Sequence, residues 1–496
     1  MPGGGTSPAA IRSAMDARQF DLVVIGSGPG GYKAAVTAVH LGAKVALVER
    51  ALPGGTCLNQ GCVPKKALMH LASMIEDITS LKGHGLVIGE VRGDFQAALE
   101  HKRRVVQGIR ENFPLWLKRL GVRLYHGHAR LRDAGTVEID TVRDRTALEW
   151  VRADRVIIAS GSRPREHPAC PSDGQRVLTS RDFMLHLRAL PRSVLCLGGG
   201  SIGTELGYLL HQFGSRVTIV ERSGQLLCQG RIPERASRML ERKFRRLGVK
   251  VIHGCSLQAA EPEGQSMRIT LTDGSQGIYD CVLVAIGREP ASAGLGLEEV
   301  GVGTDDEGFV VANEYLETSV PGIYAVGDVK RGPMTANSAL HDAKVAATNA
   351  FKGNQLRSNY HRVPFVLDSA LEIAAVGLTE VQAEDAGFEP DVARINLSGS
   401  AKSRSRHDPE GFVEVVHDEE TGQLLGGCIV GAEAGEQIQM ITAACQSPRG
   451  LWFFSDINYS HPSWCEELGN AIDPYTSAFS KSGGPVFRPG IYAAWE

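Results

Sequence analysis

The sequence of 496 residues has no long apolar segment and little net charge. No run approaches the roughly 18 consecutive apolar residues that a membrane-spanning helix needs, and the first residues lack the apolar core of a secretory signal peptide. The formal net charge is only −3, so no strong field favours nucleic acid or a membrane surface. We therefore expect a cytoplasmic protein with no nucleic-acid or membrane partner and a disordered extension over residues 1–19.

Cysteines are also scarce. Ten in a chain of this length do not make the disulfide framework of a small secreted domain. Most stand alone in apolar runs, such as Cys196 in SVLCLG and Cys281 in DCVLVAIG, and are expected to be small buried residues of strands. A structural zinc site needs two closely spaced pairs of Cys or His ligands, and no second pair has that spacing. We predict no metal site.

Glycine is abundant by contrast, with 58 residues, and two glycine-rich segments are alike. Residues 22–50 read LVVIGSGPGGYKAAVTAVHLGAKVALVER, and residues 194–222 read VLCLGGGSIGTELGYLLHQFGSRVTIVER. Each combines a β-branched strand, a glycine turn, an amphipathic helix and a second strand that ends in Glu-Arg. In both, the acid lies 23 positions after the first glycine. The chain therefore contains an internal repeat.

Each repeat predicts a dinucleotide-binding site, because the G-x-G-x-x-G pattern stands between a strand and a helix. The three glycines of such a pattern allow a tight turn, close approach of a pyrophosphate, and packing of helix on strand. The helix N-terminus adds N–H donors for the phosphates. The glycines are Gly26, Gly28 and Gly31 in the first repeat and Gly198, Gly200 and Gly203 in the second.

Acidic residues follow the predicted strands. Glu49 and Glu221 end the two repeats and are expected to accept hydrogen bonds from ribose hydroxyls. A carboxylate repels a 2′-phosphate, so Glu221 favours NAD over NADP. Asp328 follows the apolar strand of TSVPGIYAVGD; it either binds a polyol chain at the carboxyl edge of the sheet or caps a short helix.

From about residue 362 the pattern changes to alternating strands, GFVEVVHD and LLGGCIV, and a helix, AGEQIQMITAACQ. This segment has no glycine fingerprint. The predicted fold class is therefore α/β, with two Rossmann-like dinucleotide-binding domains followed by an α+β domain over residues 362–496.

The stretch GGTCLNQGCVPKK, residues 54–66, places Cys57 and Cys62 just after the first repeat. A structural disulfide is disfavoured in a reducing cytoplasm, and a zinc site lacks its second ligand pair. A redox-active pair fits, since the segment lies near the first dinucleotide. Pro64 indicates a helix that starts near Cys62. The helix N-terminus and the adjacent lysines would lower the pKa of the Cys62 thiol.

Together these motifs resemble those of the flavin-dependent pyridine nucleotide–disulfide oxidoreductases, and within them the dihydrolipoamide dehydrogenases. The resemblance starts near residue 20 and includes GSGPGGY, GGTCLNQGCVPKKAL, GGGSIGTELG, AIGREP, IYAVGD, GPMTA, EGFVEVV, AGEQI and HPSWCEE. It implies an FAD-binding domain over residues 20–165 and 291–361 and an NAD-binding domain over residues 166–290. It also implies a homodimer formed by residues 362–496.

The resemblance also implies which residues contact the cofactors. For FAD they are Gly26, Gly28, Gly31, Glu49, Gly55, Thr56, Lys66, Gly127, Gly161, Asp328 and Ala336. For the nicotinamide cofactor they are Gly198, Gly200, Gly203, Glu205, Glu221 and Gly287.

By the same resemblance, Cys62 lies against the flavin and Cys57, further out, exchanges with the dithiol of the substrate. Lys66 is implied to pair with Glu205 beside the flavin, with Lys65 as a competitor for that place.

His461 is implied as the general base, because HPSWCEE places Glu466 five residues later. A carboxylate there would fix the tautomer of the imidazole and stabilise the imidazolium. This pair is implied to reach across the dimer interface to the partner's Cys57. The implied reaction is oxidation of a dihydrolipoyl group on a carrier protein, with NAD⁺ as the hydride acceptor.

The sequence departs from the dihydrolipoamide dehydrogenase pattern in two places. The Lys65–Lys66 doublet resembles the glutathione-reductase branch, although Val36 stands where that branch has a substrate-binding arginine. Beside His461, Tyr459 and the Trp464–Cys465 pair are unusual, and Cys465 is either a bystander or an additional redox-sensitive thiol. Two alternatives therefore stay open: an NAD(P)H-dependent reductase of another disulfide, and a non-catalytic flavoprotein that senses the NADH/NAD⁺ ratio.

Overall fold

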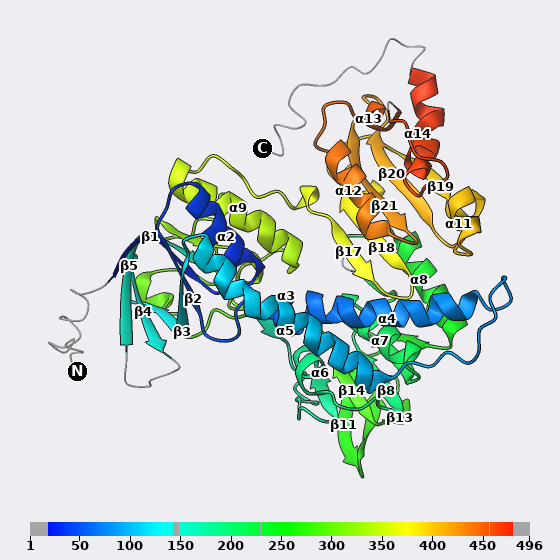
Figure 1. Cartoon of the computed structure of the whole chain (residues 1–496), viewed down its shortest axis with the longest axis horizontal. Helices are drawn as coiled ribbons and strands as arrows, with labels where there is room; N and C mark the ends of the chain where they lie inside the picture. The colour runs from blue at the N-terminus through cyan, green and yellow to red at the C-terminus, as the bar shows by residue number, and fades with distance from the viewer. Residues whose placement is uncertain (1–17, 142–147, 229, 456, 480–496) are drawn as a thin grey trace.

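The computed structural model describes residues 18–141, 148–228, 230–455 and 457–479. The described residues form three α/β regions, and two long helices run between them (Figure 1). None of the described helices is long and apolar enough to cross a membrane. The described residues also contain no group of three or more His, Cys, Asp or Glu side chains that could hold a metal ion.

The first region is built on a six-stranded sheet. Its strands are β1 (Arg18–Ile25), β2 (Val45–Glu49), β3 (Arg123–Leu131), β4 (Thr136–Thr141), β5 (Leu148–Ile158) and β16 (Ile323–Ala325). Strands β3, β2, β1, β5 and β16 are parallel, and β4 is antiparallel to its neighbours β3 and β5. Helices α2 (Pro29–His40) and α9 (Ala336–Lys352) pack against each other on this sheet (Figure 1).

The N-terminal extension is shorter than predicted. Arg18 and Gln19 already belong to β1, where their backbones pair with Val151 and Arg152 of β5. The prediction of disorder is therefore wrong for these two residues, because a free strand edge was available to them. Residues 1–17 lie outside the described part of the chain.

Between β2 and β3 the chain forms three helices, α3 (Gly55–Gln60), α4 (Cys62–Ser80) and α5 (Phe95–Arg119). Helix α4 begins at Cys62, as Pro64 in its first turn predicted. Helix α5 begins after Asp94, whose carboxylate accepts a hydrogen bond from the Ala97 N–H at 3.0 Å. Helix α4 packs on α5 and on α7 of the second region.

The second region has a parallel sheet of order β10-β9-β8-β14-β7. Its strands are β7 (Val177–Thr179), β8 (Ser193–Leu197), β9 (Arg216–Glu221), β10 (Lys250–His253) and β14 (Cys281–Val284), and its helices are α6 (Ser180–His186), α7 (Ser201–Gln212) and α8 (Glu234–Leu247). Cys196 in β8 and Cys281 in β14 are buried, as predicted.

Two smaller sheets flank this region. One is antiparallel and consists of β11 (Leu257–Glu263), β12 (Ser266–Leu271) and β13 (Gln276–Tyr279). The other pairs β6 (Ser162–Pro164) with β15 (Arg288–Pro290), again antiparallel. Because β6 follows β5 of the first region and β15 follows β14 of the second, this short ribbon joins the two regions.

The third region is an antiparallel sheet of order β17-β18-β21-β20-β19. Its strands are β17 (Phe365–Asp368), β18 (Glu372–Gly377), β19 (Pro390–Asn396), β20 (Phe412–Asp418) and β21 (Leu424–Val430), and its helices are α10 (Glu380–Asp385), α11 (Ala401–Ser405), α12 (Ala434–Ala444), α13 (Trp452–Ser455) and α14 (Glu466–Phe479). The arrangement agrees with the predicted fold class; the residue limits of the domains stay predictions.

Candidate active site

The two glycine turns adopt the same backbone geometry. Gly26 has φ of 101° and Gly198 has φ of 109°, and a β-carbon on them would lie 2.3 and 2.4 Å from a backbone carbonyl oxygen. A β-carbon on Gly31 would lie 1.7 Å from the carbonyl oxygen of Gly26, and one on Gly203 would lie 1.9 Å from that of Gly198. Only glycine fits these four positions, so the repeat seen in the sequence is also a repeat in structure.

The acid that ends each repeat is hydrogen-bonded to the glycine turn of the same repeat. Glu49 accepts hydrogen bonds from the Ser27 N–H at 2.9 Å and the Ser27 hydroxyl at 2.7 Å. Glu221 accepts from the Gly199 N–H at 2.7 Å and, with its other oxygen, from the Ser223 N–H at 2.9 Å. Each carboxylate therefore fixes the glycine turn of its own repeat, beside the place where that carboxylate is expected to bind a ribose.

One continuous cavity of about 1900 Å³ is lined by both turns and both acids. A site for one small molecule is typically about 300–1,000 Å³, so this volume suits two extended ligands. The predicted site residues that line it are Gly26, Gly28, Glu49, Gly55, Thr56, Cys57, Cys62, Lys66, Gly127, Gly161, Gly198, Gly200, Glu205, Glu221, Gly287, Asp328 and Ala336. Gly31 and Gly203 lie beneath their turns instead.

Cys57 lies in α3 and Cys62 is the first residue of α4; the two thiols are hydrogen-bonded to each other, and both are free. A hydrogen bond with the Cys57 thiol lowers the pKa of Cys62; burial opposes this effect, and the Lys65 ammonium reinforces it. The same hydrogen bond, together with burial, raises the pKa of Cys57. The predicted stabilisation of a thiolate at Cys62 therefore agrees with the structure, with Lys65 as the lysine that contributes.

The prediction that Lys66 pairs with Glu205 is wrong. The Lys65 Nζ lies 2.8 Å from Glu205 Oε1, whereas the Lys66 side chain is 63 % exposed and contacts only Asp368 among these groups. The reason is the orientation of helix α4 against α7, which carries Glu205. Because α4 begins at Cys62, Lys65 follows three residues later on the same face, and Lys66 is rotated from it by about 100°.

Two further residues of the site were not predicted. Asp368, at the end of β17, accepts a hydrogen bond from Lys65 Nζ at 2.6 Å. Arg288 donates to the hydroxyl and the carbonyl of Ser162 at 2.7 and 3.0 Å and lies 3.7 Å from Asp328. The sequence carried a signal for each residue. Asp368 is an acid at the end of the apolar run FVLD, and Arg288 belongs to the motif AIGREP.

Asp328 lies in a short 3-10 turn, Gly327–Val329, that makes no side-chain cap. Its carboxylate accepts a hydrogen bond from the Ser162 hydroxyl at 2.6 Å and faces the cavity. Helix α9, which follows, is capped by Thr335. Asp328 is therefore not a helix cap, and it lies on the cavity wall; that it binds a ligand there stays a prediction.

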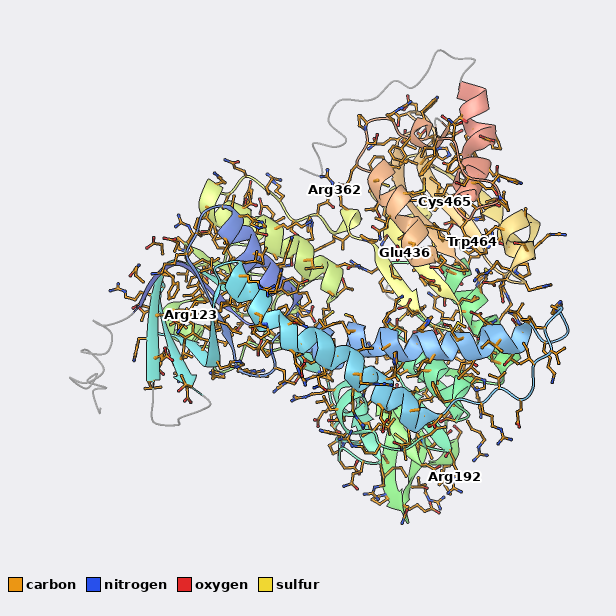
Figure 2. The ribbon with its side chains drawn as sticks, viewed as in Figure 1. Arg123, Arg192, Arg362, Glu436, Trp464 and Cys465 are labelled. Carbon is orange, nitrogen blue, oxygen red and sulfur yellow. The ribbon has the colours of Figure 1, made fainter. Side chains whose placement is uncertain are left out.

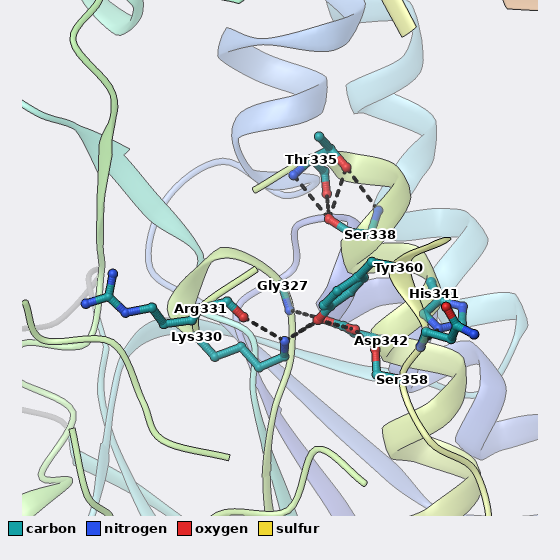
Figure 3. A network of polar contacts seen from close by, with 10 residues as sticks. Gly327, Lys330, Arg331, Thr335, Ser338, His341, Asp342, Ser358 and Tyr360 are labelled. Carbon is teal, nitrogen blue, oxygen red and sulfur yellow. Dashed lines mark hydrogen bonds and ion pairs between the residues drawn. The ribbon is translucent and has the colours of Figure 1, made fainter. Parts of the chain in front are cut away.

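A buried ion pair supports the turn that carries Asp328 (Figure 3). Lys330 Nζ lies 3.3 Å from Asp342 Oδ2, and both side chains are buried. The Tyr360 hydroxyl contacts the Lys330 ammonium and donates to Asp342 at 2.9 Å. Asp342 also accepts from the Gly327 N–H at 3.1 Å. The network thus attaches the turn to helix α9, since a buried ion pair persists when hydrogen bonds satisfy both charges.

His461 and Glu466 form the predicted pair, with Nδ1 of the histidine 2.9 Å from Oε2 of the glutamate. Burial tends to raise the pKa of Glu466, but the hydrogen bonds from His461 and the Ser463 N–H outweigh it and lower that pKa. The His461 side chain is 76 % exposed, and neither residue lines the cavity. Figure 2 shows their neighbours Trp464 and Cys465 in the third region, away from α3 and α4.

The comparisons with known proteins agree with this arrangement. Residues 20–343 match the family model described as pyridine nucleotide-disulphide oxidoreductase, and residues 363–472 match the dimerisation domain of the same family. The chain belongs to the pyridine nucleotide–disulphide oxidoreductases. Its members bind FAD and a pyridine nucleotide, and the dimerisation domain supports a homodimer.

Several relatives carry more specific names. The chain is 35 % identical over 461 residues to a dihydrolipoyl dehydrogenase of Thermus scotoductus, which covers 92 % of this chain and 97 % of that protein. A dihydrolipoyl dehydrogenase of Chlorobaculum tepidum is 34 % identical, with the same coverage. Among solved structures, the copper(II) complex of the HOCl-induced flavoprotein disulfide reductase RclA from Escherichia coli is 25 % identical, with a TM-score of 0.80 over 92 % of this chain and 99 % of that one. LpdA from Mycobacterium tuberculosis, at 23 % identity and a TM-score of 0.86 over 92 % of this chain and all of that one, shares the fold.

The family's two cofactors fit the residues of this cavity. Each turn brings glycine backbone and a helix N-terminus to the wall, which is the arrangement that binds a pyrophosphate. A β-carbon on Gly55 would lie 2.6 Å from the α-carbon of Gly28, so the backbone before Cys57 packs directly on the first turn. This contact brings the cysteines next to the first dinucleotide site.

A substitution at Gly203 tests the second site. We expect Gly203→Ala to lower kcat/KM for the nicotinamide substrate by about 100-fold, since a displacement near 1 Å in a positioning element has that effect. The bound flavin should be retained. Gly207→Ala in the same helix is the matched control, because its β-carbon would be 3.4 Å from the nearest atom. Equal kinetics of the two variants, measured by steady-state titration, would contradict the assignment.

Proposed function

We propose that the chain is an FAD-dependent dihydrolipoamide dehydrogenase that oxidises a protein-bound dihydrolipoyl group and reduces NAD⁺. The observation that carries the proposal is the Cys57–Cys62 pair, which opens onto a cavity that both nucleotide turns line. The dihydrolipoyl dehydrogenases at 34–35 % identity give further support. The chemistry that FAD supplies when bound is transfer of an electron pair from a dithiol to a nicotinamide as hydride.

The two cysteines have different roles in this proposal. A thiolate of the substrate attacks Sγ of Cys57 in the Cys57–Cys62 disulfide, and Cys62 leaves as a thiolate. The second substrate thiol then displaces Cys57, so that the substrate becomes a cyclic disulfide and the enzyme a dithiol. The lower pKa of Cys62 supports this order, because the thiol of lower pKa is the better leaving group.

His461 is proposed to take the proton of the attacking thiol. Glu466 holds the ring through Nδ1, which leaves Nε2 to accept the proton, and the carboxylate stabilises the imidazolium that forms. Because the pair does not line the cavity of its own chain, we propose that it completes the site of the partner subunit. A homodimer is then required for turnover.

Glu221 is proposed to select NAD. We expect kcat/KM for NADH to exceed that for NADPH by at least about tenfold, which corresponds to about 1.4 kcal/mol of repulsion between the carboxylate and a 2′-phosphate. Glu221→Gln should reduce this preference. Equal or better kcat/KM with NADPH in the unmodified protein would overturn the assignment of NAD.

The substrate can be tested in one cuvette. Dihydrolipoamide with NAD⁺ should produce NADH at 340 nm, whereas oxidised glutathione with NADPH should not be turned over. A second candidate is a reductase of another disulfide, which the likeness to the flavoprotein disulfide reductase RclA supports. Turnover of a different disulfide with NADH, but not of dihydrolipoamide with NAD⁺, would favour it. Absence of turnover with any thiol would favour a non-catalytic redox sensor.

A further inference from the structure

Asp368 lies where three parts of the molecule meet. Its carboxylate contacts both lysines of helix α4: Oδ2 is 2.6 Å from Lys65 Nζ, and Oδ1 contacts Lys66 Nζ. Its backbone N–H donates to Glu205 Oε1 of helix α7 at 3.0 Å. The neighbouring Ser369 hydroxyl donates to the Thr204 carbonyl at 2.9 Å. Strand β17 of the third region therefore contacts both the helix that begins at Cys62 and a helix of the second region.

The four charged groups balance each other. Lys65 and Lys66 face Glu205 and Asp368, two cations against two anions, and three of the four side chains are at most 16 % exposed. Burial tends to lower the pKa of Lys65, but Glu205 and Asp368 outweigh it and raise that pKa. Lys65 therefore stays a cation, shared between two carboxylates.

The positive charge of Lys65 also lowers the pKa of Cys62 and so stabilises its thiolate. A second carboxylate on the same ammonium reduces the positive field that reaches the sulfur. We propose that Asp368 is a positioning residue for the redox pair: it holds Lys65 between two carboxylates and so limits how strongly that cation stabilises the Cys62 thiolate. The inference rests on the proposed role of Cys62 as the inner thiol.

The other groups that face Cys62 stay constant in the test. They are the side chain at position 57 of α3, which is serine in every variant in place of the Cys57 thiol, the Lys65 ammonium of α4, the Glu205 carboxylate of α7, Arg288 of β15 and Tyr32 of α2. Glu372 of β18 faces the lysine side of the cluster.

The experiment measures alkylation of Cys62 by iodoacetamide as a function of pH. The parent is the FAD-loaded dimer with Cys57→Ser, in which no disulfide forms and the serine hydroxyl can still donate to the thiolate; mass spectrometry of the peptide reads Cys62 alone. Asp368→Asn leaves one excess cation, so alkylation at a pH below the midpoint should be roughly three- to tenfold faster. Flavin content is measured from the absorbance of each preparation.

Lys66→Gln is the opposing variant. It leaves one excess anion and should slow alkylation, by a smaller factor since Lys66 is 63 % exposed and its charge is screened. The double variant Asp368→Asn with Lys66→Gln restores the balance of charges, so its rate of Cys62 alkylation should be close to that of the parent. If the substitutions acted only through a loss of packing, the alkylation rates of both single variants would change in the same direction.

An unchanged or slower rate in Asp368→Asn with flavin retained would overturn the proposal. If that variant loses flavin, Lys66→Gln decides by itself: slower alkylation supports the role of the cluster, and an unchanged or faster rate overturns it. Turnover of dihydrolipoamide is measured separately, with Cys57 present. If the alkylation rates of Asp368→Asn and Lys66→Gln shift in opposite directions but dihydrolipoamide is not turned over, only the proposed function is contradicted. If dihydrolipoamide is turned over but the alkylation rates do not shift, only this inference is contradicted.

Discussion

Cys57→Ser should lower the rate of NADH formation from dihydrolipoamide and NAD⁺ by at least about 1,000-fold, because removal of the group that exchanges with the substrate removes the covalent route. The flavin should remain bound, since Cys57 lies in α3 and not in either glycine turn. Electron transfer from NADH to an artificial dye should stay within a few-fold of the unmodified protein, as it bypasses the cysteines.

Cys228→Ser is the matched control. Cys228 is exposed where Cys57 is half-buried, and it lines the same cavity, but it is not a member of the Cys57–Cys62 pair. Its replacement should leave dihydrolipoamide turnover unchanged. The assignment of the redox pair would be untenable if the two serine variants had similar lipoamide activity, or if Cys57→Ser lost dye reduction to the same extent as lipoamide turnover.

His461→Gln should lower lipoamide turnover by about 10²–10⁴-fold, the contribution of general base catalysis, while dye reduction by NADH persists. His407→Gln is a suitable control, because His407 is another exposed histidine of the third region. Since the ring of His461 is exposed and absent from the cavity of its own chain, the loss is expected to act on the partner's active site.

Mixed dimers test that geometry directly. The Cys57→Ser homodimer and the His461→Gln homodimer should each turn over dihydrolipoamide only at the low residual rate expected for that variant. A heterodimer of the two contains one site with Cys57 from one subunit and His461 from the other, so mixing with subunit exchange should restore activity. After random exchange of subunits, half of the dimers are heterodimers, and each heterodimer has one intact site. If the histidine acted within its own chain, mixing would restore nothing.

Much of the site could be predicted because its residues depend on local geometry. A glycine that must accept a positive φ, or that has a carbonyl oxygen within 2 Å of its missing β-carbon, leaves few other residues compatible with the fold. The two repeats therefore had the same signature in sequence as they have in structure, down to the acid after the second strand. The start of α4 at Cys62 was equally local, since Pro64 is tolerated only in the first turn of a helix.

Residues that depend on the approach of distant elements were not predictable in this way. The choice between Lys65 and Lys66 followed from the rotation of α4 relative to α7. Asp368 reaches Lys65 from 303 positions away along the chain, and no periodicity in the strand FVLD indicates which charge will meet it. Arg288 and the Lys330–Asp342 pair have the same character, because each depends on two segments that the fold brings together.

The sequence by itself determined the two nucleotide turns, the start of α4 at Cys62 and the fold class, because each rests on backbone conformations that only certain residues adopt. The tertiary structure alone decided which lysine faces the buried glutamate, that a second carboxylate balances it, and that the His461–Glu466 pair stands outside the cavity of its own chain. These are matters of charge and distance between elements far apart in sequence, and such interactions exist only once the three regions have packed.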